Sequence, residues 1–400
     1  MNDSAFAGET AKLAHEVKEW AVTQLRPFAR EADTTHLVPE GAFASVGHCP
    51  VKASPTSGKL DYPDRGSLDA SQTDGPMVLA VAVTEAMAYG DLLFLSVFRN
   101  GSGLGGKVVR ILGTPEQVER WADPLERGEL GYACFALTEP TGGSDAAAIR
   151  TTATHTETGW VLNGHKHFIS NAATSDYAVV FATIDRSLGY QGIRAFVVPL
   201  STQGFHVVKA NESKLGIRAL LTSELVLENV EVPLDHCLGW PNATGDGLRS
   251  GLRALNTTRG LVAAAAIGVA QAAIDQGREY VEARNTEFGP VRAAAIRQEL
   301  ARMEATLERC RLLSRNLARR LDNGLEHQRE AGIAKGYTPP ICERVVHRVL
   351  QLMGPDGYSE EYLVEKWHRD LKIIDIWEGT GNIQRVIVGR SLRKSATRSR

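Results

Sequence analysis

The sequence has few cysteines, and their spacing is not that of a metal site. Five occur among 400 residues, an odd number without a CxxC pair or other metal-type spacing. They are Cys49, Cys134, Cys237, Cys310 and Cys342. The pattern predicts no cysteine-based metal centre, and a reduced, cytoplasmic compartment fits it best.

An excess of one charge and long hydrophobic runs are also missing. With 45 basic and 47 acidic residues the net charge is -2, which gives no reason to expect nucleic acid or an anionic membrane as a partner. The first residues include Asp3 and Glu9 and lack the apolar segment of a signal peptide. The most apolar run, Gly260 to Ile274, is about 15 residues long, which is short for a membrane span and normal for a buried helix. We therefore expect no membrane span.

The length predicts two or three packed domains, and the first of them, residues 1–130, is expected to be helical. Apolar residues recur at helical spacing from Leu13 to Phe28, where Pro27 should kink or end the helix. The pattern is lost over residues 32–75, so this segment is expected to be irregular with little helix. Helical periodicity returns from Met77 to Tyr89.

A glycine-rich segment, Gly101 to Gly106, satisfies GxGxxG and follows an apolar run, as in a dinucleotide-binding turn. Such a unit needs a second strand that ends in an acidic residue about twenty positions later. Here Thr114 instead caps a charged amphipathic helix that should reach about Arg127. A helix junction is therefore the better interpretation.

The middle of the chain, residues 131–241, is expected to be all β, because its apolar pattern has a period of two. Two turns are expected early in it, at Glu157–Gly159 and at Asn163–Gly164. The expected strands are 151–156, 160–162, 177–184, 195–200, 205–209 and 224–232.

Residues 242–400 return to helical periodicity. We expect one helix that ends at Ala283, one from Val291 to Leu321, and one or two between His327 and Met353. Pro339-Pro340 should interrupt the last of these, with Thr338 as N-cap of the part that follows.

Near the end, Glu378 lies between Trp377 and Gly379, ahead of a helix expected from Ile383 to Leu392. A carboxylate next to an aromatic ring and a glycine suits a general base, because the glycine lets another molecule approach the backbone. The alternative is a carboxylate that only begins the helix, favoured by the helix dipole. The segment alone leaves both interpretations open.

Three motifs follow one another along the chain: Leu137–Asp145 (LTEPTGGSD), Asn163–Asn171 (NGHKHFISN) and Glu378–Thr380 (EGT). In this order they resemble the motifs of the FAD-dependent acyl-CoA dehydrogenase family. Supporting segments extend the likeness over residues 77–393. The resemblance implies an α+β fold with an N-terminal helical domain, a middle β-barrel and a C-terminal four-helix bundle.

The resemblance also implies roles for residues. The implied contacts to the flavin are Phe135, Leu137, Thr138, Gly143, Ser144, Phe168 and Ser170, and the resemblance implies that Thr380 and Asn382 also touch the cofactor. The implied contacts to the adenine and pyrophosphate of a neighbouring subunit's FAD are Arg284, Phe288, Gln351 and Gly354. Here the Arg284 motif has one extra residue, and Pro355 stands where a second glycine is frequent.

The reaction implied by the family is an α,β-dehydrogenation of an acyl thioester. Glu378 would remove the α-proton while flavin N5 accepts the β-hydride, and Ser144, Arg259 and Gly379 would lie near the substrate. Some relatives place the base on the helix that here contains Asn256-Thr257-Thr258-Arg259, which has no carboxylate. Glu378 is therefore the expected base.

The resemblance implies an electron-transfer flavoprotein as electron acceptor and a homo-oligomer, a dimer or tetramer. Two alternatives remain open. One is a dehydrogenase or oxidase that acts on an acyl group bound to a carrier protein, and the other is a non-catalytic member of the family. The second would lack the base or the flavin motif, and this chain has both.

Overall fold

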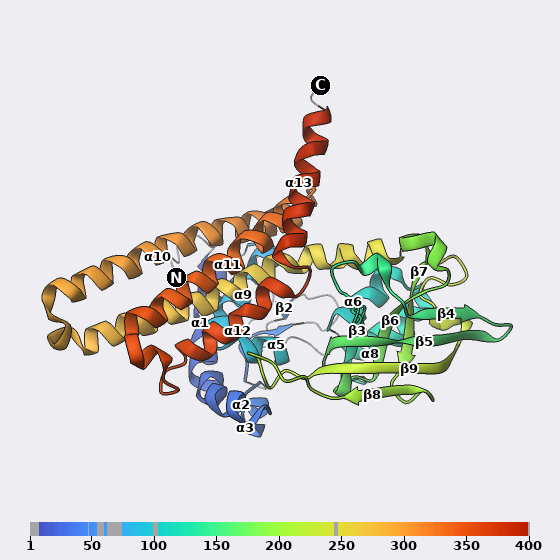
Figure 1. Ribbon diagram of the computed structural model, residues 1–400, viewed down its shortest axis with the longest axis horizontal. Helices are drawn as coiled ribbons and strands as arrows, with labels where there is room; N and C mark the ends of the chain where they lie inside the picture. Colours follow the sequence, from blue (N-terminus) through green and yellow to red (C-terminus); the bar gives the residue numbers. More distant parts are fainter. Residues whose placement is uncertain are drawn as a thin grey trace.

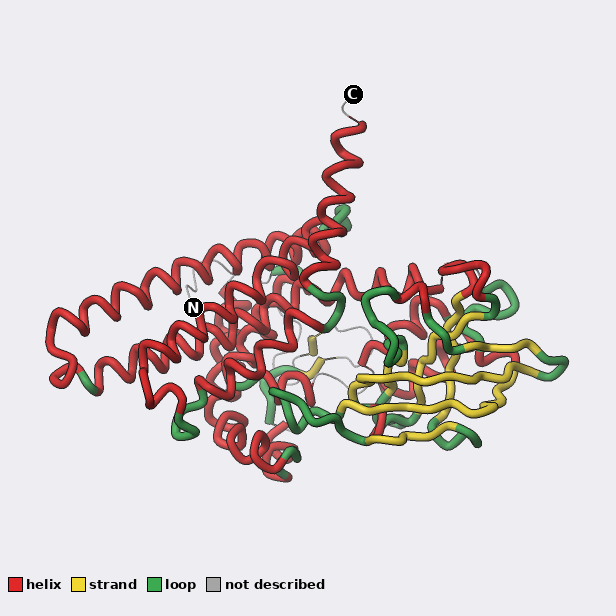
Figure 2. Tube along the Cα trace, in the orientation of Figure 1, coloured by secondary structure: helices red, strands yellow, loops and turns green. Residues whose placement is uncertain are grey.

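The protein has a helix-rich part and a β-rich part that lie next to each other (Figures 1 and 2). The computed structural model describes residues 8–46, 48–53, 60–61, 74–98, 103–243 and 247–398. Most helices that precede and follow the strands in sequence pack into one body, and the strands form a curled sheet beside it, on which the helical segments of residues 103–126 pack. The α+β arrangement predicted from the sequence is confirmed, with the predicted barrel in the form of this curled sheet.

The N-terminal helices include the two predicted from helical periodicity, near Leu13–Phe28 and at Met77–Tyr89. A π-helical turn at Ala21–Leu25 and a 3₁₀ turn at Arg26–Phe28 interrupt the first helix, which confirms the kink predicted at Pro27. The predicted helix Met77–Tyr89 is α4. The helices are α1 (Gly8–Trp20), α2 (Ala29–Thr35), α3 (Glu40–Val46), α4 (Pro76–Gly90), α5 (Leu92–Phe98), α6 (Gly103–Leu112), α7 (Pro115–Gln117) and α8 (Asp123–Glu126).

The prediction of little helix over residues 32–75 is wrong at its start. The segment contains the end of α2 and all of α3. Ala42 of α3 is buried and Gly41 lies against the ring of Phe28, so tertiary contacts stabilise a helix that the sequence favours only weakly. Two short strands, β1 (Lys52–Ala53) and β2 (Leu60–Asp61), pair antiparallel. Residues 47, 54–59 and 62–73 lie outside the described part.

The junction between the helices and the sheet agrees with the sequence interpretation. Thr114 and Gln117 form a capping box at the start of α7, and the helical stretch ends at Glu126, as predicted to within one residue. A Cβ at Gly105 of α6 would lie 2.7 Å from the carbonyl oxygen of Ala133, so glycine allows α6 to pack closely on the sheet. The glycine-rich segment is a helix junction from Gly103 on, and residues 101 and 102 are not described.

The sheet has seven strands in the order β3-β6-β4-β5-β9-β8, with β7 also paired to β6. Strand β6 pairs in parallel with β3 and antiparallel with β7, and the long strands β5 and β9 pair antiparallel. The strands are β3 (Ala133–Ala136), β4 (Thr152–His155), β5 (Gly159–Ser170), β6 (Tyr177–Thr183), β7 (Ile193–Pro199), β8 (Phe205–Lys209) and β9 (Thr222–Pro233).

The turn predicted at Asn163–Gly164 does not occur, because β5 continues to Ser170. Asn163 uses its side chain across the sheet: its Oδ1 accepts from the Asn229 backbone N–H at 2.8 Å, and its Nδ2 donates to Asn229 Oδ1 at 3.1 Å. The register of β5 on β9 shifts at this point. The residues typical of a hairpin turn therefore form a bulge in a long strand.

The C-terminal helices are α9 (Gly247–Ala283), α10 (Asn285–Asp322), α11 (Gln328–Met353), α12 (Val364–Ile376) and α13 (Gly381–Arg398). Two of the predictions made for them are wrong. Helix α10 begins before Val291, across a kink at Gly289 where φ is +70°. Helix α11 continues through Pro339-Pro340, and Thr338 is a buried residue within it and no N-cap. Packing of α11 against α9, α10, α12 and α13 outweighs the local preference of the two prolines.

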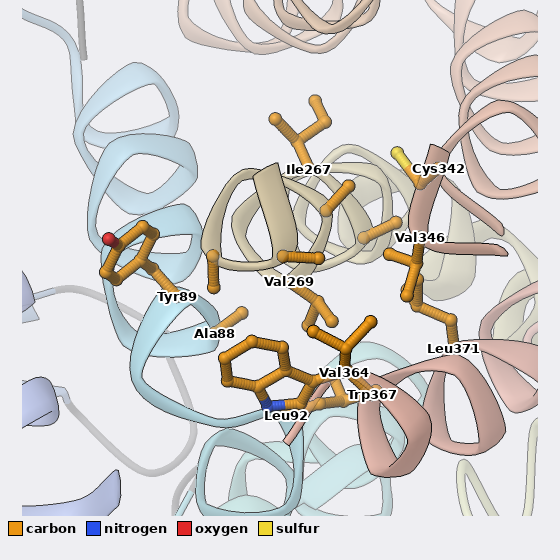
Figure 3. Packing of buried hydrophobic residues seen from close by; sticks show 14 of the residues in the cluster. Ala88, Tyr89, Leu92, Ile267, Val269, Cys342, Val346, Val364, Trp367 and Leu371 are labelled. Carbon is orange, nitrogen blue, oxygen red and sulfur yellow. The ribbon is translucent and has the colours of Figure 1, made fainter. Parts of the chain in front are cut away.

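Helix α9 lies at the centre of the helical body. Its apolar side chains meet those of α4, α11 and α12, and Figure 3 shows Val269 of α9, Val346 of α11 and Trp367 of α12 in this core. Its stretch Leu255–Ala283 is long and apolar enough to cross a membrane by length and composition, yet 94% of the most apolar window is buried inside the protein. This burial is what a core helix shows.

Candidate active site

Glu378 lies on the connection between α12 and α13, at the end of the helical body nearest the strands in Figure 1. Helix α12 ends at Ile376, and Trp377 turns the chain into extended conformation. Glu378 then has φ +52° and Gly379 has φ +90°. A non-glycine residue with positive φ is uncommon, and such strain is frequent at functional sites. Because α13 begins only at Gly381, Glu378 precedes the helix and is not part of its first turn.

The Glu378 carboxylate is held by a hydroxyl from the central helix. Thr258 Oγ1 of α9 donates to Glu378 Oε2 at 2.6 Å. Thr258 is buried, whereas Glu378 is half-buried, so one oxygen is fixed while the residue as a whole stays partly accessible. This arrangement suits a carboxylate that has to take a proton from another molecule.

Arg259, the neighbour of Thr258, is buried and holds the backbone at the same place. Its Nε donates to the Glu378 carbonyl oxygen at 3.4 Å, and its Nη1 donates to Asn256 Oδ1. Burial lowers the pKa of the guanidinium, and the charge of Glu378 opposes this. The Asn256–Arg259 turn of α9 therefore contacts Glu378 twice, once at the carboxylate and once at the backbone.

Two further residues that sequence reasoning did not assign to the site contact this connection or the last turn of α12 before it. Gln384 of α13 is fully buried, and its Nε2 donates to the Gly379 carbonyl oxygen at 3.0 Å. Lys335 of α11 is fully buried, and its Nζ donates to the Asp375 carbonyl oxygen at 2.8 Å. Burial lowers the pKa of Lys335 to about 8, against the opposing charges of Asp375 and Glu378. Lysine is rarely buried in a helix core. A lysine within a predicted helix was the only feature of the sequence that could have pointed to Lys335.

Thr380 and Asn382, expected to contact a cofactor, lie at the start of α13. Thr380 Oγ1 accepts from the Ile383 backbone N–H at 3.4 Å, and Asn382 Oδ1 accepts from Arg385 Nη1 at 2.7 Å. Asn382 is exposed and Thr380 is half-buried. Both side chains can therefore be reached from outside this chain.

A second group of residues, those implied to contact the flavin, lies at the surface of the β-rich part. The His167 backbone N–H donates to the Thr138 carbonyl oxygen at 2.9 Å, which joins the segment after β3 to β5. A Cβ at Gly143 would lie 3.2 Å from Thr138 Cγ2, so Gly143 also lies next to Thr138. The ring of Phe168 is 59% exposed and its φ is +57°. Gly143, Ser144 and Ser170 are exposed as well.

A buried ion pair underlies this surface. Lys166 Nζ lies 2.9 Å from Glu139 Oε1, and both side chains are almost completely buried. Glu139 also accepts from the Thr151 hydroxyl at 2.6 Å and from the Arg150 backbone N–H at 2.6 Å. Burial alone would raise the pKa of Glu139, but Lys166 and these donors outweigh it and lower the pKa. The pair fixes β5 to the segment that contains Thr138.

The side chains of Phe135 and Leu137 are covered by their neighbours to different degrees. Phe135 packs edge-on against Phe181 with ring centroids 5.1 Å apart, and Leu137 is 7% exposed. The Leu137 carbonyl oxygen accepts from Lys166 Nζ at 3.1 Å. The Leu137 side chain belongs to the core under the surface, and the half-buried Phe135 side chain packs against this core.

Four other predicted residues lie at or next to the C-terminal ends of α9 and α11 and the start of α10, at the end of the helical body away from the strands (Figure 1). Arg284 forms an ion pair of 2.8 Å with Asp356, and Tyr280 lies between Arg284 and Phe288 with its ring near both. Asp356 follows Gly354, so these three predicted residues are brought together. Gln351 is exposed and accepts from Arg348 at 3.1 Å.

The β-rich part contacts the helix that leads to Glu378. Asp370 of α12 accepts from the Ile217 backbone N–H, and Arg369 donates to the Leu215 carbonyl oxygen at 3.0 Å. The segment before β9 is thereby fixed to α12. A surface depression at Ala147, Arg150 and Arg186 includes none of the predicted site residues.

Comparisons with known proteins agree with this architecture. Residues 134–230 match the acyl-CoA dehydrogenase middle domain, and residues 245–393 match the acyl-CoA dehydrogenase C-terminal domain. The chain is 35% identical over 384 residues to the mitochondrial short-chain specific acyl-CoA dehydrogenase of Bos taurus, covering 96% of this chain and 90% of that protein.

Two further relatives extend the comparison. The chain is 38% identical over 295 residues to subunit CarC of the caffeyl-CoA reductase-Etf complex of Acetobacterium woodii, covering 73% of this chain and 76% of that one. The solved structure of butyryl-CoA dehydrogenase from Megasphaera elsdenii superposes with a TM-score of 0.82 at 30% identity, covering 96% of this chain and 97% of that one.

Proposed function

The chain belongs to the acyl-CoA dehydrogenase family, and on that premise we propose that Glu378 removes the α-proton of an acyl-CoA thioester. The family confirms the predicted class of enzyme, an oxidoreductase acting on CH–CH groups, and the predicted cofactor, because acyl-CoA dehydrogenases are FAD-dependent. The role of Glu378, the electron acceptor, the oligomeric state and a cytoplasmic location are proposals for this chain.

The observation that supports the role of Glu378 most strongly is its left-handed backbone conformation next to Thr258. A glutamate at φ +52° costs conformational energy, so the surrounding contacts must hold it there. The hydroxyl of Thr258 fixes one carboxylate oxygen at 2.6 Å, and the half-buried side chain can use the other. Glu378 is thus positioned as a general base whose orientation is set before substrate arrives.

Arg259 and Gln384 act as positioning residues in this proposal. Their side chains donate to the carbonyl oxygens of Glu378 and Gly379, which fixes the orientation of these peptide groups. Because a thioester α-proton is a weak acid, its removal needs both a base and hydrogen-bond donors that stabilise the developing enolate oxygen. Gly379, with φ +90°, lacks a side chain that would block a thioester from the Glu378 backbone.

The β surface fits a planar cofactor. Phe168 presents an exposed ring, Gly143 leaves the approach to Thr138 open, and the hydroxyls of Thr138, Ser144 and Ser170 can bond to ring oxygens and nitrogens. FAD bound here would supply the acceptor for the substrate's β-hydrogen as hydride. The protein's contribution is to position the ring.

A homo-oligomer, either a dimer or a tetramer, would use the residues at the end of the helical body that lies away from the strands. Arg284, Phe288 and Gly354 lie together, away from the strands that include Phe168 (Figure 1). Their proposed contact with the adenine and pyrophosphate of FAD then requires the β surface of a second chain. Arg284 would meet pyrophosphate only by exchanging its ion pair with Asp356 for one with phosphate.

An electron-transfer flavoprotein is the proposed electron acceptor. The relative from Acetobacterium woodii is named as a subunit of a reductase-Etf complex, which supports this kind of partner. An acyl-CoA is the proposed substrate, because the bovine and Megasphaera relatives are named for acyl-CoA and butyryl-CoA. The alternative of a carrier-protein thioester is tested in the same experiment.

Anaerobic mixing of the purified protein with a panel of acyl-CoA and acyl-carrier thioesters tests the proposal. We expect a yellow protein with about one FAD per chain, bleached by at least one saturated acyl-CoA. If only carrier-protein thioesters bleached the flavin, the substrate would be a carrier-bound acyl group and not an acyl-CoA. A colourless protein that cannot be reconstituted with FAD, or a flavin that no thioester reduces, would contradict the proposed function.

A further inference from the structure

Two histidines and two glutamates converge on one face of the long β5–β9 pair, and the proposed reaction uses none of them. His165 and His167 are two positions apart on β5, on the side opposite the buried Lys166. Glu224 comes from β9, and Glu212 comes from the segment between β8 and β9. Three separate stretches of chain thus bring together residue types that bind metal ions.

The contacts within this group pair each imidazole with one carboxylate. His165 Nε2 lies 2.6 Å from Glu224 Oε1, and His167 Nε2 lies 2.9 Å from Glu212 Oε1. The two rings are stacked with centroids 6.4 Å apart, so the pairs are neighbours. One potential ligand atom from each of His167, Glu212 and Glu224 lies within 4.8 Å of the others.

We propose that His165, His167, Glu212 and Glu224 bind one divalent transition-metal ion, with Zn²⁺ as the ion that the donor set fits best. Zn²⁺ is bound by imidazole nitrogens at about 2.0–2.1 Å and by carboxylate oxygens at about 2.0–2.2 Å, commonly in four-coordinate sites. Two neutral imidazoles and two carboxylates compensate the charge of a divalent ion. This proposal does not depend on the proposed function.

His167, Glu212 and Glu224 already lie close enough together for a shared ion, whereas His165 lies beside Glu224 and has to turn towards the other two ligands. The Nε2 atoms already face the carboxylates, and each imidazole would bind the ion through Nε2 once its proton has passed by way of solvent to Nδ1 of the same ring, so that both rings stay neutral. Lys209 lies 2.5 Å from the other oxygen of Glu212, Oε2, and is 46% exposed, so its ammonium can move into water. The backbone N–H of Glu212 donates to the Thr222 carbonyl oxygen at 2.9 Å, which fixes the segment that contributes this ligand.

The site adjoins the surface that contains Phe168. His167 and Phe168 both lie in the bulge of β5 between Lys166 and Ile169, and their rings stack with centroids 4.0 Å apart. An ion that holds His167 would therefore also fix the exposed ring of Phe168. The side chains of His165, His167, Glu212 and Glu224 are 43%, 21%, 12% and 26% exposed, so the ion can enter from solvent.

Titration of chelator-treated, full-length protein with Zn²⁺ against a competing chelating dye tests the proposal. We expect one Zn²⁺ per chain, an affinity at least about 100-fold lower in His167→Gln and in Glu212→Gln, and a thermal midpoint that Zn²⁺ raises only when the site is intact. His206→Gln is the matched control, because His206 is an exposed β8 histidine 3.9 Å from Glu228.

The control should keep wild-type binding. Far-ultraviolet circular dichroism of each variant shows whether it is folded. If His167→Gln is not folded, His165→Gln serves as the second variant of a proposed ligand. Absence of saturable binding by the wild type would overturn the proposal and leave two hydrogen-bonded pairs. Wild-type affinity in folded His167→Gln and His165→Gln, or equal loss in His206→Gln, would overturn it as well.

Discussion

Thr258 Oγ1 donates a hydrogen bond of 2.6 Å to Glu378 Oε2, and this contact joins the central helix α9 to the connection between α12 and α13. The two residues are 120 positions apart in sequence. Because Thr258 is buried in the central helix of the helical body, the hydroxyl has little freedom to move. The proposed base therefore has an orientation set by the core of the helical body.

Replacing Thr258 by valine should slow catalysis without removing the base. Loss of a hydrogen bond to a charged group costs roughly 1.5–3 kcal/mol, which corresponds to roughly 10- to 100-fold in the rate of flavin reduction if the contact is kept in the transition state. Stopped-flow measurement of that rate under anaerobic conditions checks the prediction. Thr258→Ser keeps the hydroxyl and should remain within a few-fold of wild type. Equal rates for the valine and serine variants would show that the hydroxyl does not matter.

Replacing Phe168 by alanine should weaken FAD binding. Its ring is 59% exposed, and aromatic stacking contributes roughly 0.5–1.5 kcal/mol, so the dissociation constant for FAD should rise roughly 2- to 10-fold. Titration of the apoprotein with FAD, followed by flavin fluorescence, measures this. Phe43→Ala is a control, because Phe43 is 54% exposed on α3. If the Phe168 variant bound FAD as tightly as wild type, stacking on this ring would be excluded.

Lys366→Met should destabilise the fold strongly. Lys366 Nζ lies 2.8 Å from Asp91 Oδ2 and 2.5 Å from Asp370 Oδ2, and all three side chains are almost completely buried. Removing the cation leaves two carboxylates buried together, which should lower the free energy of unfolding by about 3–5 kcal/mol. Urea denaturation measures the change. Lys372→Met, which breaks an exposed pair with Glu343, should cost less than about 1 kcal/mol.

The position of Lys335 predicts a pH dependence of stability. Burial lowers its pKa from 10.5 to about 8, so between these values the unfolded chain binds a proton on this lysine that the folded chain does not. The unfavourable contribution of Lys335 to folding is complete below about pH 8 and disappears as the pH rises towards 10.5. The free energy of unfolding of wild type minus that of Lys335→Met should therefore increase across this window. A difference that stays flat would show that Lys335 is not perturbed.

The sequence predicts the fold wherever the local pattern and the packing agree. The periodicity of α4 and α9 and the capping box at Thr114 are examples. The predictions failed where a distant contact outweighs a local signal. Asn163 bonds to Asn229 across the sheet and keeps β5 extended. Helix α11 continues through Pro339-Pro340 because neighbouring helices cover it.

The sequence motifs predicted the candidate site, but they did not predict the contacts that hold the segment around Glu378. Glu378 stands out in sequence because a glycine and an aromatic residue flank it. Thr258, Lys335 and Gln384 are ordinary residues of three different helices, and only the packing of α9, α11 and α13 brings them to the end of α12 and the connection that follows it. The His165–Glu224 and His167–Glu212 pairs likewise depend on strand register.

Glu378→Gln provides the most direct test of the central claim. The variant keeps the shape of the side chain and removes its ability to accept a proton, so it should bind FAD and acyl-CoA yet reduce the flavin roughly 10²- to 10⁴-fold more slowly. The anaerobic rate of flavin bleaching is the measurement, with exposed Glu116→Gln as the matched control at wild-type rate. A Glu378→Gln enzyme that bleaches at the wild-type rate would contradict the assignment of Glu378 as the base.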